Sequence, residues 1–284
     1  MSARGGCLGL LVLASIVACK DPLPPSTEAG GASGGPSGST GGSSGTDGAT
    51  LATDAGSDAP TNAPGVPSLA PMLGGHVLAF QRYQAPGGVS VVSTPAITTT
   101  TGGRSTIVVS AGRGAIAASA RPTDNKNLAP YPQLGASHAY TQYPTSGTAL
   151  YALPGAMGGS GHVFRTTTPA DDEVTLAAVE VVNGTRVQDF QWNEVLAGKP
   201  ITSLSVTTTG PATLVAFWWG DAGVGGDKTA TPNNGFVVID SILQAGALVQ
   251  CAVATRTVSA AGTYSVTWTS TPIQGAQLWL AAIQ

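Results

Sequence analysis

The sequence predicts an all-β fold for residues 76–284, and three observations support this class. Short segments alternate apolar and polar residues, turn signals rich in Gly, Pro and Asn separate them, and no long stretch of helical periodicity interrupts the pattern. About a dozen short strands spaced in this way are typical of an antiparallel sandwich or barrel.

The N-terminal segment, residues 1–18, has the pattern of a secretion signal. Arg4 precedes an apolar run over residues 8–17. A membrane-spanning helix needs about 20 apolar residues, whereas a cleavable signal needs about 7 to 15, so this run is too short to span a bilayer. We therefore expect the segment to be removed during export.

The signal ends at Ile16-Val17-Ala18-Cys19, which resembles the lipobox of bacterial lipoproteins. That motif places an aliphatic residue three positions before an invariant cysteine and a small residue just before it. The resemblance implies a diacylglyceryl thioether on Cys19, cleavage before Cys19 and acylation of the freed amine, and two or more acyl chains give stable anchoring. The alternative is an ordinary secretion signal in which Cys19 is only a small residue near the cleavage site.

Residues 19–75 are predicted to be a disordered linker. Gly, Ser, Thr, Ala and Pro dominate them, so the segment buries too little apolar surface to offset its ordering entropy. A Gly-rich chain of about 55 residues has a root-mean-square reach on the order of 40 Å. Lys20 stands where enterobacterial lipoproteins kept at the inner membrane usually carry Asp, which favours the outer membrane or cell surface.

The predicted β-domain begins at His76-Val77-Leu78-Ala79-Phe80. Within residues 263–269, Tyr264, Val266 and Trp268 share one face, as in a half-buried strand. Further strands are expected over residues 97–101, 106–110, 174–182, 204–208, 213–219, 236–242 and 277–283. We expect one sandwich domain over residues 76–284, and two abutting modules divided near Gly198-Lys199-Pro200 are the alternative.

The order of these segments resembles a recurrent module of secreted bacterial proteins. The first half has a Thr-rich strand, the aliphatic strand Thr106-Ile107-Val108-Val109-Ser110, the loop Asp124-Asn125-Lys126-Asn127 and then Ala177-Ala178-Val179-Glu180. The second half has a Thr-rich strand before Leu214-Val215-Ala216-Phe217 and closes with Ala261-Gly262-Thr263-Tyr264. The resemblance implies an antiparallel, jelly-roll-like β-sandwich and no particular chemistry.

Charge and cysteine content argue against two classes of protein. Charged residues make up 10% of the chain and the formal net charge is −3, so no basic field attracts nucleic acid. A disulfide framework is not expected, because Cys7 leaves with the signal and Cys19 carries lipid. Cys251 lies in an apolar run and is expected to be buried and inert.

The sequence shows no catalytic, cofactor-binding or metal-binding constellation. His76, His138 and His162 lie far apart and lack metal-ligand spacing. The Gly-rich residues 155–161 predict a hairpin loop, because a phosphate cradle requires a helix after the glycines.

Acidic residues leave two alternatives open. Asp171-Asp172-Glu173 is expected to be a solvated turn, with a structural calcium ion as the alternative. Asp124-Asn125, or Asp221 with Asp227, are further candidate calcium ligands. Hydrolysis of sugars requires two facing carboxylates, and no spacing selects a pair from the candidates. These are Glu173, Glu180, Glu194, Asp189 and Asp240.

Trp218 and Trp219 give the remaining functional indication. Neighbours on a strand point to opposite faces, so one is expected in the core and the other is a candidate platform for a sugar ring, unless a loop or neighbouring layer covers it.

We therefore expect a lipid-anchored cell-envelope or surface protein. Its partners would be the membrane, through lipid on Cys19, and a polysaccharide or another envelope protein. The β-sandwich would be non-enzymatic and serve adhesion, structure or interaction. The alternatives are a surface carbohydrate-binding module and a secreted hydrolase with an unrecognised site.

Overall fold

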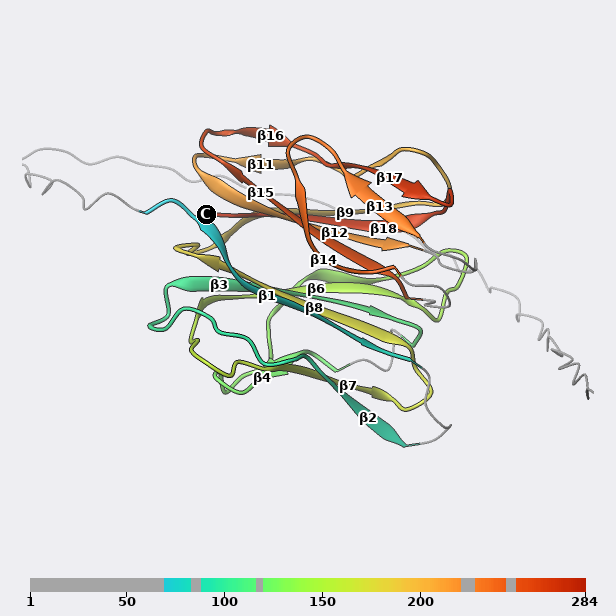
Figure 1. Cartoon of the computed structure of the whole chain (residues 1–284), viewed down its shortest axis with the longest axis horizontal. Coiled ribbons are helices and arrows are strands. Elements are labelled where there is room, and N and C mark those ends of the chain that lie inside the picture. The colour runs from blue at the N-terminus through green and yellow to red at the C-terminus, as the bar shows by residue number, and fades with distance from the viewer. Residues whose placement is uncertain (1–68, 83–87, 116–119, 221–227, 244–248) are drawn as a thin grey trace, which may run out of the picture. The chain divides into compact units, whose positions relative to one another are not determined.

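The predicted all-β sandwich is confirmed. The computed structural model describes residues 69–82, 88–115, 120–220, 228–243 and 249–284, which form antiparallel sheets and no helix (Figure 1). The first strand begins at Met72, before the predicted start at His76. Cys19 and the predicted signal lie outside the described residues, as does the linker up to residue 68.

The first half of the β-structure contains a large sheet and a small one. The large sheet has the order β1-β8-β3-β6-β5, and the small sheet has the order β2-β7-β4. The strands are β1 (Met72–Gln81), β2 (Val89–Ser93), β3 (Ser105–Arg113), β4 (Thr123–Asp124), β5 (Gln133–Ala139), β6 (Gly147–Ala156), β7 (Phe164–Pro169) and β8 (Val174–Val182).

The second half repeats this arrangement. Its large sheet has the order β9-β18-β12-β15-β14, its small sheet has the order β10-β17-β13, and β11 pairs with β16. The strands are β9 (Val187–Val195), β10 (Ile201–Thr202), β11 (Val206–Thr208), β12 (Ala212–Gly220), β13 (Thr229–Pro232), β14 (Val237–Ile242), β15 (Cys251–Val258), β16 (Gly262–Tyr264), β17 (Thr267–Thr271) and β18 (Ala276–Ile283).

Both halves are jelly rolls. In each one, successive strands alternate between the large and the small sheet at the start, and the last strand returns beside the first. Reading β1 as β9, β3 as β12, β6 as β15 and β8 as β18 superimposes the two strand orders. The described β-structure therefore repeats one jelly-roll topology, and the strand pair β11-β16 is present only in the second half.

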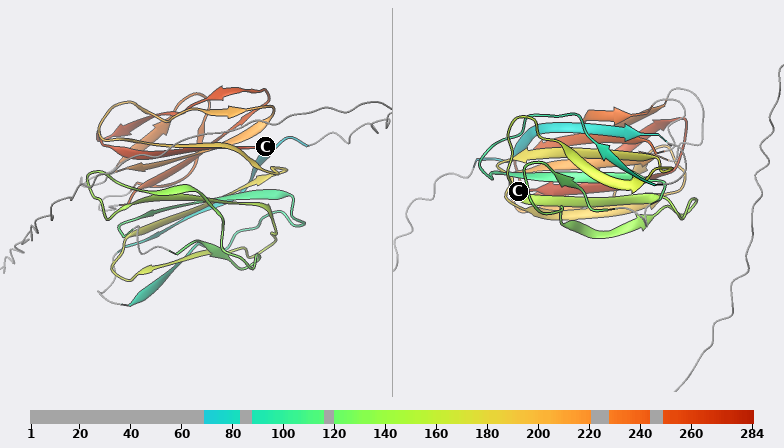
Figure 2. Two further views of the ribbon diagram at one scale, coloured as in Figure 1. Left: turned by 180° about the vertical axis from the view of Figure 1, so that it is seen from behind. Right: turned by 90° about the horizontal axis from the view of Figure 1, so that it is seen from below.

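The two halves stack as four layers, with the small sheets outside and the large sheets inside (Figures 1 and 2). Each jelly roll has its own apolar core between its large and small sheets. A third core lies between the two large sheets and includes Val108, Leu150, Phe217, Val253 and Trp279. The described β-structure therefore belongs to one compact unit.

Burial of both faces explains the composition of the central strands. In β3, Ile107 and Val109 face the core of their own jelly roll, whereas Val108 faces the other jelly roll. In β12, Leu214 and Val215 divide in the same way. Strands buried on both faces are continuous apolar runs rich in β-branched residues, which is the pattern at these positions.

A large side chain of one sheet fits a gap in the other at the centre of the stack. Gly112 and Trp219 are the penultimate residues of the equivalent strands β3 and β12. A Cβ added to Gly112 would overlap the Trp219 ring. The indole Nε1 of Trp219 also donates a 3.0 Å hydrogen bond to Ser110 Oγ. Because equivalent positions carry the largest and the smallest side chain, the two similar sheets interlock.

Contacts at the two edges of the stack also join the halves. His76 Nδ1 on β1 lies 2.8 Å from Asp240 Oδ2 on β14. At the other edge the His138 ring on β5 stacks on Trp192 of β9, with ring centroids 3.7 Å apart. Both large sheets are therefore held together from edge to edge.

Some local predictions differ from the structure. Residues 97–101 form only an isolated bridge, Ile97 to His162, and no strand. The Gly-rich residues 155–161 were predicted to be a hairpin loop, but they connect β6 in the large sheet to β7 in the small one. The chain passes between the jelly rolls at residues 183–186, whereas Gly198-Lys199-Pro200 lie inside the second jelly roll, between β9 and β10.

Candidate functional site

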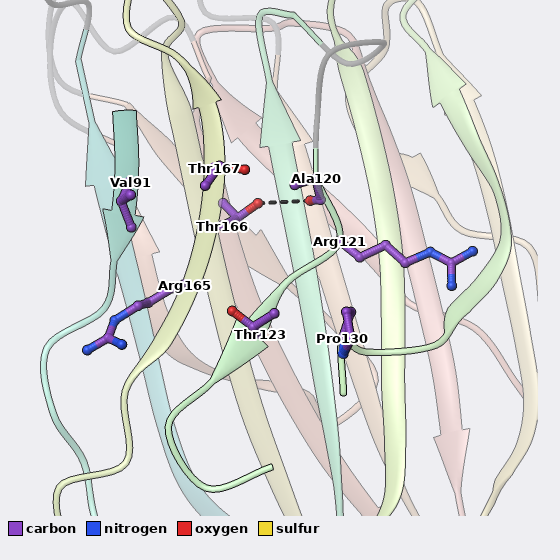
Figure 3. A pocket seen from close by; sticks show the side chains of 8 residues that line it. All are labelled: Val91, Ala120, Arg121, Thr123, Pro130, Arg165, Thr166 and Thr167. Carbon is purple, nitrogen blue, oxygen red and sulfur yellow. Dashed lines mark hydrogen bonds between the residues drawn. The ribbon is translucent and has the colours of Figure 1, made fainter. Parts of the chain in front are cut away.

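An open pocket lies on the outer face of the small sheet of the first jelly roll (Figure 3). Its volume is about 470 Å³. Strands β2, β7 and β4 supply Val91, Arg165, Thr166, Thr167 and Thr123, and the chain around β4 supplies Ala120, Arg121 and Pro130.

Strand alternation determines which side chains reach the pocket. On β7 the side chains of Phe164, Thr166 and Thr168 are buried, while Arg165 and Thr167 are exposed. Val91 on β2 pairs with Thr167 and is 56% exposed. The outward face therefore combines apolar surface, hydroxyl groups and a cation.

Two arginines flank the pocket. Figure 3 shows the Arg121 and Arg165 side chains extending in opposite directions from the residues between them. Both residues are exposed, and neither guanidinium forms an ion pair with a carboxylate in the described part of the chain. Exposed guanidinium groups of this kind can bind planar anions with two parallel hydrogen bonds.

A third arginine supports the pocket from beneath. Arg113, at the end of β3, is 1% exposed. Its Nη2 donates to the Ala120 carbonyl at 2.9 Å and to Thr166 Oγ1 at 2.7 Å, and Thr166 Oγ1 donates to the same carbonyl. Burial lowers the pKa of Arg113 to about 10, while Tyr151 and Asp172 oppose this shift. Arg113 thus joins the large sheet to the wall of the pocket.

Beside the pocket, a buried polar network surrounds Asp124. Its Oδ1 accepts the backbone N–H groups of Lys126 and Asn127, and its Oδ2 accepts the Tyr131 hydroxyl at 2.5 Å. His162 Nε2 lies 3.1 Å from the same Oδ2, and His162 Nδ1 lies 2.8 Å from Thr99 Oγ1. The four side chains connect β4 with the segments before β3 and β7.

Electrostatics in this network favour the charged carboxylate. Burial by itself would raise the pKa of Asp124, but contacts from His162, Tyr131 and the backbone of Asn127 and Lys126 hold this pKa well below its ordinary value. Because protein donors already occupy the Asp124 oxygens, this carboxylate is a structural anchor in the fold, and a calcium ion would have to displace them.

Asn125 and Asn127 hold the Gly-rich segment against this network. Asn127 Nδ2 donates to the Met157 carbonyl, and Met157 N–H donates to Asn127 Oδ1. Asn125 makes the same kind of reciprocal pair, with the Gly161 carbonyl and the Val163 N–H. The polar loop after β4 therefore fixes the conformation of residues 157–163.

The prediction of a solvated turn at Asp171-Asp172-Glu173 is wrong for two of the three residues. Asp172 and Glu173 are buried, and only Asp171 is exposed. Asp172 Oδ2 accepts the Thr168 hydroxyl at 2.6 Å. Glu173 Oε1 accepts the Val249 N–H at 2.9 Å, which connects the two jelly rolls. These carboxylates replace water with protein donors, so they can be buried.

The remaining candidate carboxylates have separate partners. Glu180 is buried and accepts Gly75 N–H, Thr100 N–H and the Ser105 hydroxyl. The others are held by protein donors at different places: Glu194 by Thr141 and Gln277, Asp189 by Thr207 and Gln191, and Asp240 by His76. The contacts of these residues therefore give no facing pair of carboxylates.

Neither tryptophan of the predicted platform faces solvent. Trp218 is 0% exposed in the core of the second jelly roll, and Trp219 is 4% exposed between the two large sheets. Their side chains do point to opposite faces, as strand geometry requires. The second indole is covered because the other jelly roll lies on that face.

The cysteine and the three histidines of the described residues each have a separate environment. Cys251 is free and buried, as predicted, and burial raises the pKa of its thiol well above the ordinary value. His76, His138 and His162 make separate contacts with Asp240, Trp192 and Asp124. Within the described residues, no group of three or more His, Cys, Asp or Glu side chains is placed to hold a metal ion. Asp221 and Asp227 lie outside the described residues.

The pocket itself was missed by the sequence interpretation. Arg121 and Arg165 are 44 positions apart in the numbering and lie on different strands or loops, so no local spacing relates them. The alternation of exposed Arg165 and Thr167 with buried neighbours was the one available signal.

Comparisons with protein-family models, with curated proteins and with solved structures found no match. Over the described residues, no helix has the length and apolar character needed to cross a membrane.

Proposed function

We propose that this chain is a lipid-anchored cell-envelope protein whose double jelly roll is a non-enzymatic binding module. The observation that carries the binding role is the open pocket on the small sheet β2-β7-β4, which combines apolar surface, threonine hydroxyls and two exposed arginines. Ligand sites commonly join apolar surface to a few polar groups in this way.

The burial of the titratable groups favours a binding role over a catalytic role for this jelly roll. The His162 and Asp124 side chains are both 0% exposed, and neither lines the pocket. Asp172, Glu173 and Glu180 are buried and accept hydrogen bonds from the fold. These buried acid and base groups serve the structure of the jelly roll, whereas its exposed arginines are available to a partner.

The anchor rests on Cys19 and the lipobox resemblance. The predicted linker of about 55 residues would give the module a reach on the order of 40 Å from the lipid surface. Such a reach suits a protein that contacts other components of the envelope.

A palmitate-labelling experiment tests the anchor. We expect the wild-type chain to incorporate labelled palmitate and sediment with membranes, and Cys19→Ala to lose both properties. Cys251→Ala is the matched control, because its thiol is buried, and it should label as the wild type does. Labelling that persists in Cys19→Ala would exclude this anchor.

A sedimentation experiment tests the binding role. The purified Cys19→Ser chain is mixed with delipidated envelope fragments, and we expect it to sediment with them. A chain that stays in the supernatant at every concentration of fragments would contradict a binding module.

A carbohydrate is the favoured class of partner, since the pocket joins an apolar floor to hydroxyl and guanidinium groups. The pocket, rather than Trp218 or Trp219, provides the support for this candidate.

A further inference from the structure

The surface charge of the first jelly roll differs in sign from the charge of the whole chain. The chain has a formal net charge of −3. In the first jelly roll, however, Asp172, Glu173 and Glu180 are buried, and protein donors occupy the oxygens of Asp124. Asp171 is the only exposed acidic residue in the described part of this half.

Basic residues dominate the same surface. Arg82, Arg104, Arg121 and Arg165 are exposed, and Lys126 is half-buried. Burying acidic groups while exposing basic ones gives this jelly roll a positive surface, and buried Arg113 adds a charge beneath the pocket. A positive surface attracts anionic partners and raises their local concentration.

We propose that the pocket on β2-β7-β4 binds a carboxylate-bearing polysaccharide, a polymer of uronic acids. This inference rests on the proposed binding function and names its ligand class. Arg121 and Arg165 would bind two carboxylates of one polymer chain, while Val91 and Pro130 contact the apolar face of a sugar ring between those carboxylates.

The arrangement of the lining favours a polymer over a single anion. The two arginine side chains extend away from each other in Figure 3, so their guanidinium groups do not converge on one point. Repeated anionic groups along one chain can meet both of them. Thr123 and Thr167 lie among the lining residues, where their hydroxyls can exchange hydrogen bonds with sugar hydroxyls.

Binding of the purified Cys19→Ser chain to polygalacturonate tests this proposal. Fully methyl-esterified polygalacturonate is the matched ligand, because it keeps the sugar backbone and removes the charge. We expect binding to the acidic polymer, no measurable binding to the ester, and weaker binding as ionic strength rises.

Substitutions test whether Arg121 and Arg165 bind the polymer. Arg121→Gln with Arg165→Gln should lower the affinity about tenfold, since two exposed charge-assisted contacts are lost. The control pair Arg186→Gln with Lys199→Gln removes the same charge from exposed positions outside the first jelly roll, and its affinity should stay within about twofold of the parent Cys19→Ser chain. Circular dichroism should show the same fold for all three proteins.

Four results would overturn the proposal. They are no binding to polygalacturonate, equal binding to the ester, unchanged affinity in the pocket variant, and equal or tighter binding to polyglutamate or anionic vesicles. If the Cys19→Ser chain sediments with envelope fragments yet does not bind polygalacturonate, the ligand class is wrong and the proposed function stands. If it binds neither, the binding function fails as well.

Discussion

At the scale of single residues, buried charges organise the loops of the first jelly roll. Arg113 donates to the Ala120 carbonyl and the Thr166 hydroxyl, and Asp124 gathers the polar loop that follows β4. A buried charge is stable only when it is paired or hydrogen-bonded, so removing one partner leaves the others unsatisfied. The wall of the pocket therefore depends on residues that do not reach solvent.

Arg113→Met should lower the free energy of unfolding by about 3 kcal/mol, because the change leaves buried acceptors without a donor. Urea denaturation measures this loss. Arg104→Met is the control, since Arg104 is exposed, and it should change stability by less than about 0.5 kcal/mol. Equal stability of the two variants would show that Arg113 does not support the pocket.

The lowered pKa of Asp124 predicts that the protein loses stability in acid. Its pKa is lower in the folded protein than its ordinary value of 3.8, so its contribution is present at neutral pH and is lost as the pH falls below about 4 to 5. Asp124→Asn should therefore be less stable at pH 7 and show a flatter decline towards pH 3. Thermal melts of the wild type, Asp124→Asn and the exposed-residue control Asp171→Asn measure this, and parallel curves for all three would contradict it.

At the scale of elements, the sequence predicted the positions of the strands better than it predicted which strands pair or pack together. The expected strand over residues 174–182 matches β8. The expected strand over residues 263–269 is instead divided into β16 and β17, although Val266 and Trp268 do lie in the core. The prediction of a strand over residues 97–101 was wrong, because a threonine-rich sequence favours an extended segment whether or not a neighbouring strand is present. The burial of Trp219 could not be predicted, because its cover comes from a distant strand with a glycine at the facing position.

The contact between Gly112 and Trp219 gives a test at this scale. Gly112→Ala should destabilise the protein by about 1 to 3 kcal/mol, because the new methyl group overlaps the indole ring. Gly210→Ala is the matched control, since an added Cβ would have its nearest neighbour 3.6 Å away. In a double-mutant cycle, Trp219→Leu should offset part of the Gly112→Ala loss, and additive losses would exclude the interlock.

At the scale of the whole molecule, the two jelly rolls share the core between their large sheets. Separating them would expose Val108, Phe217 and Trp279, which are now almost completely buried. The described β-structure should therefore unfold in a single transition with equal calorimetric and van't Hoff enthalpies. Differential scanning calorimetry measures this, and two resolved transitions would show that the halves are independent.

Candidate sites differ in how much of them a sequence alone can predict. The lipidation of Cys19 was predicted from a local motif, whereas the pocket depends on which strands become neighbours and on which acidic groups are buried. Asp172 and Glu173 read as surface charges until their donors, Thr168 and the Val249 N–H, are brought beside them. The surface charge of this jelly roll thus depends on which acidic groups its fold buries, and not on its composition alone.

We propose that a lipid on Cys19 holds this compact β-unit on the cell envelope. Intact-mass spectrometry of the protein purified from membranes tests it most directly. We predict a mature chain that begins at Cys19 and carries the added mass of a diacylglyceryl group and an amide-linked acyl chain. A mature chain that begins elsewhere, or that begins at Cys19 without added mass, would contradict this lipid anchor.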